Sequence, residues 1–166
     1  EEIIKDETDV EYVWYDFQPG QRLISFLYAL YFIRDFDVFS QEESVEILAC
    51  LRLHVRVLYE QEAQREPEKC NHQSVRTMAL YWGMPLVADD GDYDKIHTLA
   101  RDLCIFEGLN LFLPSGLEYE NSPSYHAFVL WHLRDFRLLA TRRGDSLPQA
   151  FDQVIDSAIR VLFVLC

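Results

Sequence analysis

The chain has 166 residues, of which 49% are hydrophobic and 14% aromatic, and its formal net charge is −13. This length favours a single domain, and the apolar content can supply a hydrophobic core, which excludes a wholly disordered chain. The acidic charge, with no run of five Lys or Arg residues, argues against a nonspecific nucleic-acid binder. The sequence also contains no run of 18 uncharged apolar residues, so it predicts no membrane span. The acidic first residues also lack the pattern of a signal peptide.

Three helices are predicted in the first half of the chain. After Pro19-Gly20, apolar residues recur at helical spacing, at Leu23, Phe26, Leu27, Leu30 and Tyr31. The second helix begins after Ser40, which forms a predicted capping box with Glu43, and it is expected to end before Pro67. Its predicted apolar positions are Val45, Leu48, Val55 and Leu58. A third helix is expected from near Asn71 to Gly83 or Pro85.

Three further helices are predicted after residue 88. A turn at residues 89–92 precedes the fourth, for which Gly108 is the expected stop. The fifth begins at Asn121-Ser122-Pro123, with an N-cap followed by proline, and the sixth follows a predicted capping box of Ser146 and Gln149. Because no strand alternation extends beyond a few residues, the sequence predicts an all-α fold of about six helices in antiparallel pairs, forming one domain over residues 1–166.

The cysteines predict no metal site. Cys50, Cys70, Cys104 and Cys166 form no CxxC pair and have no spacing typical of zinc ligands, so we expect neither a metal nor a cofactor in this segment. Cys50 and Cys104 fall within apolar helical patterns and are predicted to be buried thiols.

A first polar cluster lies at the predicted start of the third helix. It consists of Asn71-His72-Gln73, with Arg76 one turn after His72. Taken alone, Asn71 is an ordinary candidate for a helix N-cap, and His72 for a surface histidine near a helix N-terminus.

A second polar cluster spans residues 116–126. Here a loop leads into the fifth helix, whose first turns present Tyr125 and His126. A tyrosine near the positive end of a helix dipole suits proton exchange, but a tyrosine packed among helices is the more common case.

The two clusters together resemble the heparinase II/III-like polysaccharide lyases, including alginate and oligoalginate lyases. The residues that carry the resemblance are Asn71, His72, Glu120, Ser122, Pro123, Tyr125 and His126. Trp14 and Arg22 also fall where these proteins often have a tryptophan and an arginine. The family combines an incomplete (α/α) toroid with a C-terminal antiparallel β-sandwich. The resemblance therefore implies that residues 1–166 are part of such a toroid, without the β-sandwich domain.

What the resemblance implies chemically is β-elimination on a uronic-acid-containing polysaccharide. By position, Asn71 resembles the donor that neutralises the sugar carboxylate, His72 a base or substrate-positioning group, and Tyr125 the catalytic acid. Substrate-binding or supporting roles are expected for Arg76, Glu120 and His126. An acidic polysaccharide or oligosaccharide is the implied partner, and a periplasmic or secreted location is implied as well.

Several family positions differ in this sequence. Ser115 stands where many relatives have aspartate, and Val75 and Val129 replace a glutamate and an arginine of the heparin-type enzymes. The substrate contacts of those enzymes therefore do not transfer. A further catalytic histidine or tyrosine would lie outside this segment, so the 166-residue chain is expected to be inactive alone.

Other functions remain open at this stage. A non-catalytic carbohydrate-binding relative would use a cleft lined by Tyr119, Tyr125, Trp131 and Trp82. A helical scaffold domain would use neither polar cluster. A glycoside hydrolase needs two carboxyl groups about 5–9.5 Å apart, for which Glu118 and Glu120 in one loop are poor candidates.

Overall fold

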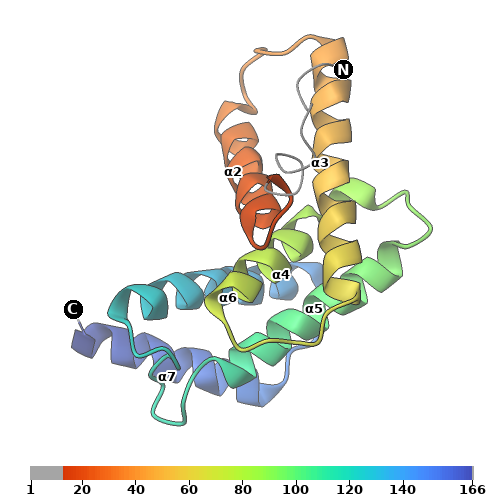
Figure 1. Ribbon diagram of the computed structural model, residues 1–166. Helices are drawn as coiled ribbons and strands as arrows, with labels where there is room; N and C mark the ends of the chain where they lie inside the picture. Colours follow the sequence, from red (N-terminus) through yellow and green to blue (C-terminus); the bar gives the residue numbers. More distant parts are fainter. Residues whose placement is uncertain (1–12, 166) are drawn as a thin grey trace.

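The computed structural model describes residues 13–165 and is all-helical over that range, with one isolated bridge between Phe112 and Glu118 and no strand. In residues 13–165, six α-helices and a short 3-10 helix account for the regular structure (Figure 1). Their bounds are α2 Gln18–Ile33, α3 Gln41–Ala63, α4 Asn71–Gly83, η1 Met84–Val87, α5 Tyr93–Asn110, α6 Pro123–Arg143 and α7 Gln149–Leu165. None of these helices is long and apolar enough to cross a membrane.

Helix α4 lies at the centre of the fold. It contacts α2, α3, α5 and α6, and 11 of its 13 residues are buried. In Figure 1, α2 and α3 rise side by side from the part of the molecule formed by α4, α5, α6 and α7. Because α4 has neighbours on all sides, it buries polar residues as well as apolar ones, and those polar residues need partners inside the protein.

Capping explains most helix starts. The predicted capping box is confirmed: Ser40 Oγ accepts the Glu43 N–H, and the Glu43 carboxylate accepts the Ser40 N–H. The predicted start of α6 is confirmed as well: Ser122 is the N-cap, its side chain accepts the Tyr125 N–H, and Pro123 follows as the first helical residue. The N-cap of α4 is Cys70, so the interpretation of Asn71 as a cap is wrong. Helix α7 begins at Gln149, which excludes Ser146 as its N-cap.

The predicted apolar faces of the first two helices are only partly correct. Leu23, Val55 and Leu58 are fully buried, whereas Phe26, Tyr31, Val45 and Leu48 are exposed. These exposed residues belong to the C-terminal half of α2 and the N-terminal half of α3, which extend away from the other helices (Figure 1). Among residues 13–165, the two helices pack mainly against each other there, and an apolar cavity of about 250 Å³ remains between them.

Two predictions about single residues are also wrong. Cys50 is exposed because it lies on this extended part of α3, whereas Cys104 is buried as predicted. Gly108 does not end its helix, which continues to Asn110. The physical reason for a glycine at position 108 is close packing, because a Cβ there would lie within 2.6 Å of the Phe151 ring of α7.

Gly108→Ala is expected to destabilise the protein by about 1–3 kcal/mol, as overpacking of a core does. The gain in helix propensity of up to about 1 kcal/mol does not compensate, because the Phe151 ring that must move is fully buried in the core. Urea denaturation measures the effect. Gly91→Ala is the control, because a Cβ at position 91 meets nothing within 4 Å. Equal stabilities of the two variants would contradict the packing argument.

Candidate functional site

The first turn of α4 carries Asn71, which joins the two polar clusters. Asn71 is the first residue of the helix and is 8% exposed. Its Nδ2 donates a long hydrogen bond of 3.5 Å to Oε2 of Glu120, 49 residues further along the chain. The structure therefore brings the loop before α6 against the N-terminus of α4.

His72 is half-exposed and is held from two sides. Its Nδ1 lies 2.6 Å from Oδ2 of Asp16, and its ring centroid lies 4.5 Å from that of Phe17. Both contacts come from the segment that precedes α2. The ring is thus held by Asp16 and Phe17, while the His72 side chain as a whole is 51% exposed.

Arg76 is buried beneath His72 in an ion-pair network. Its Nη1 donates to Oδ1 of Asp16 at 2.7 Å, and its Nε donates to Oε1 of Glu62 at 2.6 Å. Burial by itself lowers the pKa of this guanidinium, but the charges of Glu62 and Asp16 outweigh that effect and raise it. At 1% exposure Arg76 has no access to a substrate, so its place in the structure is that of a support for Asp16.

The loop before α6 is ordered by Glu118 and His126, both fully buried. The Glu118 carboxylate accepts the Glu120 N–H at 2.9 Å, and burial raises the pKa of Glu118. The Glu118 N–H donates to Nδ1 of His126 at 3.2 Å, and Nε2–H of His126 donates to the Ala158 carbonyl at 2.9 Å. With both ring nitrogens occupied, His126 holds the loop in place, and the loop in turn holds Glu120 beside Asn71.

Tyr125 lies in the first turn of α6, and 45% of the residue is exposed. Its N–H donates to the Ser122 side chain, which fixes the backbone of this turn. Among the described residues, no hydrogen bond or ion pair joins Tyr125 to Asn71 or His72. The link between the clusters is therefore the Asn71–Glu120 contact, five residues before Tyr125.

The aromatic residues predicted to line a binding cleft are divided between two settings. Tyr119 and Tyr125 are exposed at the start of α6. Trp131 stacks on Tyr28 at a centroid distance of 6.2 Å, and Tyr28 packs edge-on against Trp82 at 5.0 Å. Trp82 is thus packed against the core between α2 and α4, whereas Trp131 of α6 is 39% exposed.

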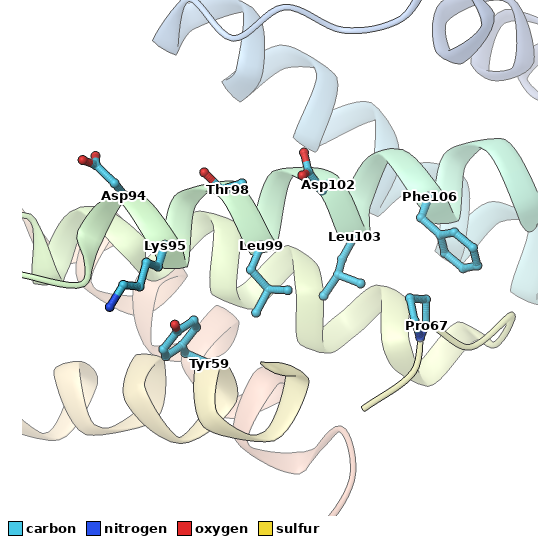
Figure 2. Close-up of a pocket in the computed structure, with 9 residues that line it drawn as sticks. All are labelled: Tyr59, Pro67, Asp94, Lys95, Thr98, Leu99, Asp102, Leu103 and Phe106. Atoms are coloured by element: carbon cyan, nitrogen blue, oxygen red, sulfur yellow. The ribbon is translucent and has the colours of Figure 1, made fainter. Parts of the chain in front are cut away.

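A wide cavity of about 670 Å³ lies elsewhere, between the C-terminal part of α3 and α5 (Figure 2). Leu99 and Leu103 of α5 point toward the side of Tyr59 and Pro67. Asp94, Thr98 and Asp102 point to the opposite side of the helix. It is lined by Tyr59, Pro67, Asp94, Lys95, Thr98, Leu99, Asp102, Leu103 and Phe106, none of which belongs to the two polar clusters.

Asp16 and Glu62 are the residues that sequence reasoning missed. They lie 56 and 10 residues before His72, respectively, and no local pattern marks either of them. Within residues 13–165, no group of three or more His, Cys, Asp or Glu side chains is arranged to hold a metal ion. Comparison with protein-family models, with characterised proteins and with solved structures gave no match.

Proposed function

We propose that this chain is part of the helical toroid of a lyase that cleaves uronic-acid-containing polysaccharides by β-elimination. In this proposal the parent protein also contains the C-terminal β-sandwich domain and the remaining catalytic group. The observation that supports it is the contact between the Asn71 amide and the Glu120 carboxylate, because it unites the two clusters that resemble the lyase motifs.

The Asn71 contact suits the first requirement of the reaction. The proton on the carbon next to a sugar carboxylate is only weakly acidic, and a donor to that carboxylate stabilises the negative charge that develops when the proton leaves. Asn71 already donates to a carboxylate, that of Glu120, from a largely buried position. A uronate carboxylate would take the place of Glu120 as the acceptor.

The remaining steps need one base and one acid. His72 or Tyr125 takes the proton, the electron pair forms a carbon–carbon double bond, and the glycosidic carbon–oxygen bond breaks. Tyr125 then supplies a proton to the leaving oxygen. Both side chains are accessible to a polymer, since His72 and Tyr125 are about half exposed, whereas Arg76 and His126 are buried and support the site.

The test uses the 166-residue chain and the parent protein side by side. Each is incubated with alginate, heparan sulfate and hyaluronan, and the absorbance of unsaturated uronate products is followed. We expect turnover of one polymer by the parent and none by the 166-residue chain. Robust turnover by the shorter chain would contradict a site shared between two domains. Polymer binding by the parent without product would instead favour the non-catalytic carbohydrate-binding alternative.

A further inference from the structure

The contacts of Asp16 determine which nitrogen of His72 can react. Oδ2 of Asp16 lies 2.6 Å from Nδ1 of His72, so Nδ1 must carry a proton to donate to the carboxylate. This holds whether the ring is neutral or charged. Nε2 is then the nitrogen that gains and loses a proton.

We infer that Asp16 is a positioning residue that keeps the His72 proton on Nδ1 and leaves Nε2 free to accept a proton from the substrate. The identity of that substrate rests on the proposed function, but the state of the ring does not. Asp16 plays no direct part in the reaction, since its two carboxylate oxygens are occupied by His72 and Arg76.

The position of Asp16 is itself fixed by buried charges. Oδ1 of Asp16 accepts from Nη1 of Arg76, whose Nε is bound to Glu62. Arg76 and Glu62 are 1% and 3% exposed. Phe17 packs against the His72 ring and limits its rotation. The carboxylate is therefore held in one orientation by a group that lies in the core.

Arg76 also makes Asp16→Asn an informative substitution. An arginine only donates hydrogen bonds, so the amide oxygen of the new side chain must face Arg76. The amide NH₂ group then faces His72 and donates to Nδ1. The His72 proton must move to Nε2, which removes the free acceptor at that nitrogen. A matching change of tautomer accompanies the replacement of aspartate by asparagine in the Ser-His-Asp triad.

The backbone tolerates this substitution. Asp16 has a φ of 49°, in the left-handed region that asparagine adopts as readily as aspartate. Alanine at this position would add backbone strain to the loss of the carboxylate, so Asp16→Asn is the cleaner variant.

The test is nitrogen-15 NMR of the imidazole rings of the 166-residue chain, at a pH raised until each ring is neutral. His72→Gln assigns the His72 signals. We expect His72 to carry its proton on Nδ1 in the wild type and on Nε2 in Asp16→Asn. A wild-type proton on Nε2, or an unchanged tautomer in the variant, would overturn the inference. Even if the variant fails to fold, the wild-type spectrum shows whether the His72 proton lies on Nδ1.

Two controls accompany the spectra. His126 is an internal reference, because its bonds to the Glu118 N–H and the Ala158 carbonyl require the proton on Nε2 in every sample. Asp89→Asn likewise removes a carboxylate bound to an arginine, Arg52, and should leave His72 unchanged. The result is independent of the lyase assay, so a parent without lyase activity would contradict the proposed function and leave the role of Asp16 intact.

Discussion

Tyr125→Phe in the parent protein is expected to lower turnover by about 10²–10⁴, the usual contribution of a positioned general acid or base. Only the phenolic O–H is lost, and the ring keeps its volume. Since 45% of Tyr125 is exposed, stability and polymer affinity should change little. Turnover and affinity are measured separately on a polymer that the parent cleaves.

The control variant for this prediction is Tyr119→Phe, because Tyr119 is an exposed tyrosine, at 55% exposure, in the loop that precedes α6. It should retain nearly full turnover. Asn71→Ala is expected to reduce turnover by about 10²–10³, by analogy with the loss of an oxyanion-hole donor. If Tyr125→Phe kept more than about a tenth of the wild-type turnover, Tyr125 would not be the catalytic acid.

A second large effect is expected from Glu107, a carboxyl group buried in the core. It is 1% exposed, and burial raises its pKa from 4.5 to about 8. Thr77 Oγ lies 2.8 Å from Glu107 Oε1 and 3.0 Å from the Gln73 carbonyl oxygen. The single hydroxyl proton of Thr77 serves only one of these acceptors, but a protonated Glu107 can donate to Thr77, which then donates to Gln73. The contacts favour the neutral acid.

The stability of the wild type should therefore fall with rising pH because of Glu107. Between 4.5 and about 8, the folded state binds a proton that the unfolded state has released, so the free energy of unfolding decreases as pH rises. Glu107→Gln has no such proton. Relative to the wild type, it should gain about 4 kcal/mol between about pH 5 and about pH 9.

Urea denaturation of both proteins at the two pH values measures this difference. Glu60→Gln is the matched control, because Glu60 is exposed on α3 and its replacement should give no pH-dependent gain. A constant difference between wild type and Glu107→Gln across this range would show that Glu107 is ionised in the folded protein.

Local sequence signals were sufficient for the helices. The Ser40 capping box and the start of α4 near Asn71 were predicted correctly, because each depends on neighbouring residues. Burial was harder to predict. Val45 and Leu48 fit the apolar stripe of the helix as well as Val55 and Leu58 do. Only Val55 and Leu58, however, are buried in the core. Such a difference depends on where the rest of the chain lies.

The site was predictable only where residues form a recognisable string. Asn71 and Glu120 were singled out by their neighbours in sequence, and the structure places their side chains in contact. The Asp16–His72 contact joins single residues far apart in the chain, and many other acidic residues could have occupied that place. Ion pairs of this kind depend on how distant segments pack together, so they could not be predicted from the neighbouring residues in the sequence.

The burial of α4 also has a consequence for how this sequence can diverge. In a helix with 11 of 13 residues buried, few positions accept a substitution without loss of stability. The N-terminal half of α3, with exposed Val45 and Leu48, can change more freely by comparison. Asn71 and His72 are the first residues of α4, so a constraint on the sequence of α4 also keeps their spacing and orientation constant. Homologues should therefore lose similarity in α3 long before the start of α4 moves.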